Sequence, residues 1–159
     1  MTIREYKQED REAVEQCIFE FQKEEYQRLP HYWEPPEKAT KPYVDYLIKN
    51  LEKDSGKLFV AEMDGKVVGI VAVSIDEEKS PCVALKKHGY ISDIAVLKEY
   101  RGRGIGKELL KRAEEFTKES GFEFIHLDVT IDNPAVDFYH SQGWTDQGIR
   151  MEKKLKSND

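Results

Sequence analysis

The sequence contains few of the features that mark secreted, membrane or metal-binding proteins. Its only cysteines are Cys17 and Cys82, too few for a disulfide framework or a four-ligand zinc site. The apolar run Val67–Val73 falls far short of the roughly 20 residues that span a bilayer. The N-terminal segment also lacks the apolar stretch of a signal peptide. We therefore expect a soluble, cytoplasmic protein with no metal and no membrane partner.

Basic residues do not exceed acidic ones, which argues against nucleic acid as a partner. The chain has 25 Lys and Arg against 31 Asp and Glu, a formal net charge of −6. Proteins that bind a phosphate backbone present a basic face, and this balance opposes one. The length of 159 residues fits one domain, since domains usually contain about 100–200 residues. We expect a single domain over residues 1–155 and a flexible tail over 156–159.

The spacing of apolar and turn residues predicts alternating helices and strands. A helix is expected from about Asp10 to Gln27, followed by a loop over Leu29–Lys41, where prolines interrupt the helical pattern. A tight hairpin is expected at Asp64-Gly65, because both residue types tolerate positive φ. In full, strands are expected over 2–6, 58–62, 67–75, 90–96, 124–129 and 149–152, and helices over 10–27, 43–51, 104–121 and 134–139.

This order, β-α-α-β-β-β-α-β-α-β, indicates an α/β (α+β) domain. The expected sheet is mixed and largely antiparallel, with helices flanking it. Cys17 lies on the apolar stripe of the first helix and is expected in the core.

The most informative segment runs from Ile94 to Leu110, where a strand leads through a basic glycine-rich turn into a helix. Glycines let a ligand approach the backbone, and the unpaired N–H groups at a helix N-terminus attract anions. The turn therefore suits a phosphate, although its glycines could equally serve only to relieve strain. Neither common nucleotide motif fits, because Lys107 stands where a dinucleotide site needs glycine and Glu108 where a P-loop needs Ser or Thr.

The turn Arg101-Gly-Arg-Gly104-Ile-Gly106 resembles the Arg/Gln-x-x-Gly-x-Gly/Ala signature of the GNAT superfamily of N-acetyltransferases. The resemblance continues through Leu127-Asp-Val129, Asn133-Pro-Ala135…Phe138-Tyr139 and Gly143-Trp144. It implies a GNAT-like fold and acetyl-CoA as cosubstrate. It places acetyl-CoA on Ile94, Ala95, Val96, Arg101, Gly102, Arg103, Gly104, Ile105, Gly106, Lys107 and Asn133.

The resemblance also suggests how an acetyl group would move to an amine without a covalent intermediate. The pantetheine arm would pair with the strand edge at Ile94–Val96, and an N–H near Val96 would stabilise the oxyanion. Tyr139 matches the family tyrosine that protonates the departing thiolate. Asp93 could accept the proton of the amine, although a strand aspartate also serves structural hydrogen bonds. Asn133 is equally explained as a helix cap.

The acceptor site has to come from the variable segments. The loop residues Tyr32, Trp33 and Glu34 combine aromatic faces with a negative charge, which suits a cationic amine, but a packed proline-aromatic loop explains them as well. The acceptor could be a small amine or a peptide or protein amine, and the oligomeric state stays open, with a homodimer as one option. A competing interpretation is a domain of the same fold that senses CoA or a nucleotide without turning it over.

Overall fold

The computed structural model describes residues 1–155, and the expected tail over 156–159 lies outside them. The chain forms two compact units, Met1–Leu127 and a second unit that starts at Asp128. Its elements are β1 (Thr2–Glu5), α1 (Arg11–Arg28), α2 (Pro36–Lys53), β2 (Lys57–Met63), β3 (Lys66–Glu77), β4 (Lys87–Val96), α3 (Ile105–Glu119), β5 (Ile125–Leu127) and α4 (Ala135–Ser141). No helix among the described residues is long and apolar enough to cross a membrane.

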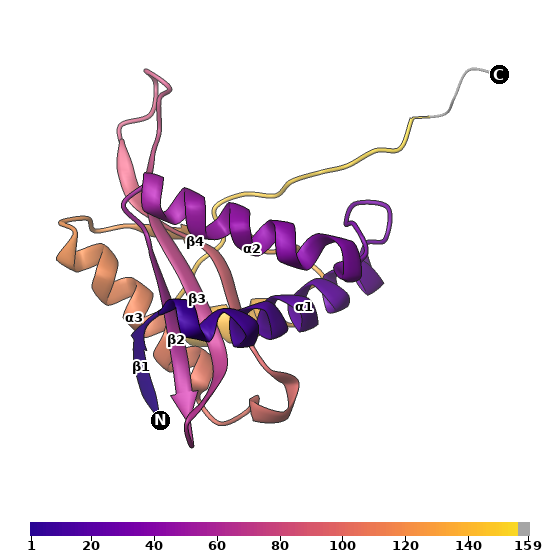
Figure 1. Ribbon diagram of the computed structural model, residues 1–159. Helices are drawn as coiled ribbons and strands as arrows, with labels where there is room; N and C mark the ends of the chain where they lie inside the picture. The colour runs from indigo at the N-terminus through magenta and orange to yellow at the C-terminus, as the bar shows by residue number, and fades with distance from the viewer. Residues whose placement is uncertain (156–159) are drawn as a thin grey trace. The chain divides into compact units, whose positions relative to one another are not determined.

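The sheet of the first unit has the strand order β1-β2-β3-β4-β5. Neighbouring strands are antiparallel except β4 and β5, which are parallel. The hairpin between β2 and β3 turns at Asp64 and Gly65, whose φ angles of 52° and 74° confirm the expected tight turn. The mixed, largely antiparallel sheet flanked by helices confirms the predicted fold class (Figure 1).

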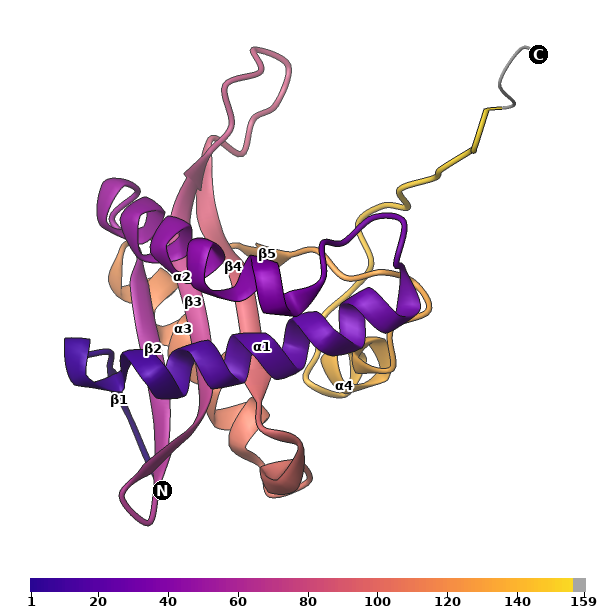
Figure 2. The ribbon, with the colours of Figure 1, turned by 45° about the vertical axis from the view of Figure 1, so that its right-hand side comes forward.

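Helices cover both faces of this sheet, α1 and α2 one face and α3 the other (Figure 2). Side chains alternate across β2 and β3, so Val60 and Ile70 pack against the two-helix layer. On the opposite face, the ring of Phe59 lies 6.2 Å from that of Phe116 in α3. Cys17 is only 1% exposed within the first of these cores, as its position on the apolar stripe predicts.

A bulge in β4 changes which side of the strand each residue faces. Ala72 pairs with Asp93 and Val73 with Ile91, so Ser92 is left as the extra residue. Before the bulge, a Cβ added to Gly89 would meet Thr117 of α3. After it, Ala95 packs in the α1 and α2 core. The extra residue therefore turns Asp93 toward the two-helix layer.

The loop predicted over Leu29–Lys41 is too long, because α2 already begins at Pro36. A proline at the first helical position loses nothing, since its N–H would be unpaired there. The hydroxyl of Thr40 then donates to the Pro36 carbonyl at 2.8 Å inside the first turn. Pro42 lies inside the helix, where the burial of Thr40 before it and Val44 after it offsets the missing hydrogen bond.

The strand predicted over residues 149–152 does not form. Ile149 is 74% exposed and Met151 is 90% exposed, and the described residues after α4 contain no strand. An alternating pattern forms a strand only where a neighbouring strand supplies hydrogen bonds, and the pattern by itself does not show whether one is present.

Candidate functional site

The turn before α3 has the backbone of an anion-binding site. Gly102 and Gly104 have φ angles of 75° and 79°, which glycine adopts without strain. Gly104 is the N-cap of α3, and the first bond of the helix runs from the Glu108 N–H to its carbonyl at 3.2 Å. Within the described chain, the N–H groups of residues 102–107 therefore have no hydrogen-bond partner. A Cβ at Gly102 or Gly104 would meet no atom within 4 Å, so the space above the turn is open.

Arg101 is anchored rather than extended toward that space. Its Nε donates to the Val96 carbonyl at 2.9 Å, and its Nη1 lies 2.9 Å from a carboxylate oxygen of Glu24 in α1. The Lys98 N–H donates to Glu20, one turn earlier in α1, at 3.0 Å. The guanidinium thus ties α1 to the end of β4.

The other two cations of the turn differ in their contacts. Arg103 lies over the ring of Tyr100, 5.2 Å from its centroid, and donates to the Glu99 carbonyl at 3.3 Å. Lys107 is exposed in the first turn of α3. Both add positive charge near the helix N-terminus, where the helix dipole already favours an anion. The Ile105 side chain is 1% exposed in the core, so this residue offers only its N–H to a ligand.

The far edge of β4 is open after Ile91. Parallel pairing with β5 ends at Ile91 and Leu127, and no other described strand continues it. The Leu97 N–H donates to the Val68 carbonyl of β3 at 2.9 Å. Since N–H and C=O groups alternate along a strand, those of Ile94 and Val96 point away from β3, to the open edge.

Ala95 differs from its two neighbours. Its main-chain groups point to β3, and its side chain, 8% exposed, packs in the core. Its main-chain groups are therefore not available to a ligand at the open edge, unlike those of Ile94 and Val96 on either side of it.

Asp93 is a buried carboxyl, 4% exposed, on the α2 side of β4. The hydroxyl of Tyr43 donates to its Oδ2 at 2.8 Å. Burial raises the pKa of Asp93, and hydrogen bonds from Tyr43 and Ser92 act in the opposite direction. A carboxyl with a raised pKa holds a proton more readily than an ordinary aspartate, which suits a group that accepts one.

Tyr139 and Asn133 belong to the second unit. Asn133 Oδ1 accepts a hydrogen bond from the N–H of Ala135, the first residue of α4, at 2.8 Å, so it caps the helix as predicted, although Pro134 occupies the N-cap position. The half-buried ring of Tyr139 lies 5.4 Å from that of Phe138 and 6.1 Å from that of Trp144. Two aromatic rings therefore pack against this phenol ring.

The loop between α1 and α2 exposes the predicted acceptor residues. Tyr32 is 56% exposed and Trp33 is 38% exposed, and their rings meet edge to face with centroids 5.0 Å apart. Glu34 is also exposed. The aromatic pair is accessible to a ligand, as an acceptor surface requires.

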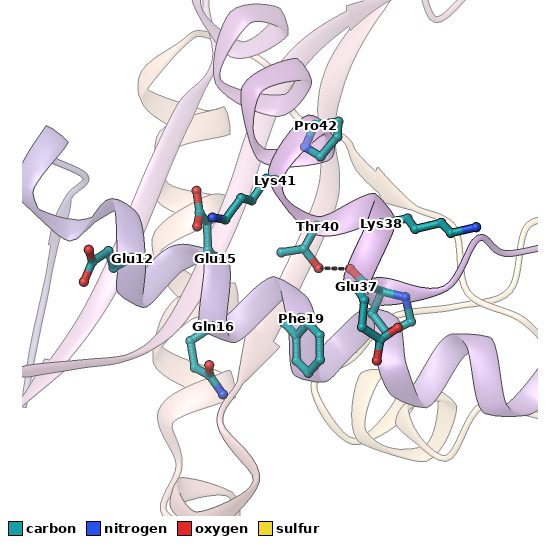
Figure 3. A pocket seen from close by; sticks show the side chains of 10 residues that line it. Glu12, Glu15, Gln16, Phe19, Glu37, Lys38, Thr40, Lys41 and Pro42 are labelled. Carbon is teal, nitrogen blue, oxygen red and sulfur yellow. Dashed lines mark hydrogen bonds between the residues drawn. The ribbon is translucent and has the colours of Figure 1, made fainter.

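A shallow groove of about 510 Å³ lies between α1 and α2 (Figure 3). The part of α1 that lines it is the side opposite the buried Val14 and Ile18. Its charges largely cancel, and it contains none of the predicted site residues. Its lining residues are Glu12, Glu15, Gln16, Phe19, Pro36, Glu37, Lys38, Thr40, Lys41 and Pro42.

Sequence reasoning missed three residues near the predicted site, Tyr43, Glu20 and Glu24. Tyr43 is 50 residues from Asp93, and Glu24 is 77 from Arg101, so only the folded chain brings each pair together. The spacing of Glu20 and Glu24 offered a partial signal, because residues four apart share a helix face. Among residues 1–155, no group of three or more His, Cys, Asp or Glu could hold a metal ion.

Comparison with known proteins adds a family match. The model of the acetyltransferase (GNAT) family matches residues 15–144. The chain is 29% identical to an uncharacterised N-acetyltransferase of Methanocaldococcus jannaschii over 82% of its length, and 34% identical to an N-alpha-acetyltransferase of Sulfurisphaera tokodaii over 65%. It spans 58% and 64% of those two relatives. A candidate acetyl transferase of Pyrococcus furiosus, 32% identical, superposes with a TM-score of 0.76, covering 97% of this chain and 99% of that one.

Proposed function

This chain belongs to the GNAT family of acetyltransferases, and from that premise we propose that it transfers an acetyl group from acetyl-CoA to a primary amine. The proposal rests on two features that occur together: the open edge of β4, and the N–H groups without hydrogen-bond partners at the N-terminus of α3. A long cosubstrate with a phosphate at one end and amide groups along its arm needs both features.

The pyrophosphate would rest on the amides of residues 102–107, with Arg103 and Lys107 supplying charge. The pantetheine arm would add to the β4 edge through the main-chain groups of Ile94 and Val96. The Val96 N–H would then donate to the thioester oxygen as it becomes an oxyanion. Arg101 would support this geometry indirectly. Its guanidinium is paired with Glu24, and its Nε holds the Val96 carbonyl in place.

The transfer would proceed by direct attack in a ternary complex. The amine nitrogen, once neutral, forms a bond to the thioester carbon, and the carbon–sulfur bond breaks. Before the attack, Asp93 accepts the ammonium proton, directly or through water. After it, the nitrogen gives up a second proton to Tyr139 as Tyr139 donates its own to the leaving thiolate. The loop residues Tyr32, Trp33 and Glu34 would contact the body of the acceptor.

A thiol-release assay with acetyl-CoA and a panel of amines tests this proposal, together with calorimetry of CoA binding. An enzyme releases CoA thiol only when an amine is added. Binding of CoA with no release for any amine would instead favour a sensing module of the same fold, and absence of CoA binding would refute both.

A further inference from the structure

A buried carboxylate and three tyrosines lie together between α2 and β4, and the transfer chemistry does not account for all of them. Asp93 accepts a hydrogen bond from the Tyr43 hydroxyl at 2.8 Å. The ring of Tyr43 lies 6.1 Å from that of Tyr46, with an angle of 33° between the planes. Burial and the Asp93 carboxylate raise the pKa of Tyr43, and Tyr46 of α2 and Tyr90 of β4 contribute to the same shift.

The β4 bulge explains why Tyr90 and Asp93 lie on the same face. Tyr90 pairs with Ser74, and Asp93 pairs with Ala72 on the same strand. Ser74 and Ala72 are two residues apart in β3, so they share the face that α1 and α2 cover. In a regular strand, with Ser92 paired rather than bulged, residues 90 and 93 would face opposite sides.

Exposure increases from the carboxylate outward. Asp93 is 4% exposed, Tyr43 and Tyr90 are half-buried, and Tyr46 is 61% exposed. The group thus extends from the exposed ring of Tyr46 inward to the phenol of Tyr43 and the buried Asp93 carboxylate. We refer to Tyr43, Tyr46, Tyr90 and Asp93 as the tyrosine cluster.

The hydrogen bond within the tyrosine cluster fixes what it can bind. The only hydrogen of the Tyr43 hydroxyl goes to Asp93, so its oxygen offers lone pairs alone to a ligand. Among residues 1–155, no Lys, Arg or His forms an ion pair with Asp93, so its buried charge lacks a cation. A donor of N–H groups that carries positive charge satisfies both requirements, and an aromatic face adds attraction for a cation.

We propose that the tyrosine cluster receives the amine of the acceptor as an ammonium ion, and that the substrates are therefore primary amines that are cationic at neutral pH. This inference rests on the proposed function. Asp93 directly precedes Ile94, and three strand residues span about 10 Å, so the ammonium would lie near the Val96 end of the open edge. One ammonium proton would pass to the Tyr43 oxygen as the Tyr43 hydrogen moves to Asp93, which frees the nitrogen lone pair for attack.

The test measures binding of phenethylammonium and of 2-phenylethanol, its uncharged counterpart of similar size, to the protein saturated with CoA. With CoA in place of acetyl-CoA, nothing reacts, and calorimetry reports the dissociation constants. We expect the ammonium to bind at least tenfold more tightly than the alcohol. Tyr46→Leu should weaken ammonium binding about two- to fivefold, as for an exposed aromatic ring, and Tyr43→Phe about tenfold or more.

The matched control is Phe124→Leu, which removes a ring of similar exposure, 54%, outside the cluster and should change nothing. Equal affinity for amine and alcohol would overturn the inference, and so would unchanged ammonium binding in Tyr46→Leu. Should Tyr43→Phe fail to fold, the exposed Tyr46 variant decides alone. Failure of CoA to bind refutes the proposed function instead, since ammonium binding can still be measured on the protein without CoA.

Discussion

The two variants Gly104→Asp and Gly104→Asn separate the charge of a side chain at the α3 N-terminus from its size. Both side chains are of nearly equal volume, and both residue types tolerate the left-handed conformation that φ of 79° requires. A Cβ at this position meets no atom within 4 Å, so neither variant clashes. We expect each to lose about 1 kcal/mol of folding stability through backbone strain alone.

Only the aspartate should weaken CoA binding strongly. A carboxylate about 5 Å from a bound phosphate, at an effective dielectric constant of about 20 to 40, costs roughly 2–3 kcal/mol per pair of charges. This corresponds to about a 30- to 140-fold increase in the dissociation constant. The asparagine variant should bind CoA within about threefold of the wild type, since any loss comes from the strained backbone.

Calorimetry with CoA measures both dissociation constants, and thermal unfolding checks the fold. Salt should reduce the difference between the two variants, because the repulsion is screened over about 10 Å at 0.1 M. Equal CoA affinity for the aspartate and asparagine variants would refute the placement of the pyrophosphate on this turn.

Three further predictions concern other parts of the molecule. Tyr139→Phe should retain CoA affinity but lower the turnover number by roughly 10²–10⁴, and unchanged turnover would leave Tyr139 a packing residue. Trp33→Ala should raise the Michaelis constant for the amine up to about thirtyfold and leave that for acetyl-CoA unchanged, as steady-state kinetics with each substrate varied would show. Asp10→Asn should cost about 2–3 kcal/mol of unfolding free energy at pH 7, because Asp10 accepts hydrogen bonds from Arg4 at 2.7 and 2.8 Å. The pKa of Asp10 is lowered by Arg4, so this cost should disappear in denaturation curves as the pH falls from about 4 through that lowered pKa, and a cost independent of pH would contradict the assignment.

The features that the sequence predicted well are local: each is determined by residues that are adjacent in the chain. The Asp64-Gly65 turn, the helix after Gly104 and the Asn133 cap each follow from a few adjacent residues with distinct backbone preferences. The start of α2 was predicted too late, because Pro42 favours a helix boundary by local rules while burial of its neighbours keeps it inside the helix.

The contacts that complete the site were beyond sequence reasoning for a different reason. Asp93 could be proposed from its position on a strand, but its side of the sheet depends on Ser92, and nothing in the sequence marks that residue as a bulge. The basic side chain of Arg101 suggested a phosphate ligand, whereas folding supplies Glu24 as its partner. Both outcomes depend on strand register and helix packing, which a single sequence does not encode locally.

The bulge at Ser92 reverses, within one strand, which positions point their main-chain groups to the outer edge of β4. Upstream of it, β4 directs the N–H of Gly89 to the Phe124 carbonyl, where it is used for pairing within the chain. Downstream, the same edge presents Ile94 and Val96 to whatever lies outside the sheet. If Ser92 were instead paired with Ala72 in a regular ladder, odd and even positions would exchange roles over the rest of the strand, turning the Asp93 carboxylate toward α3 and the Ala95 amide to the open edge. The open edge at Ile94 and Val96 and the position of the Asp93 carboxylate therefore depend on the same bulge, and loss of the bulged pairing would alter both in a single step.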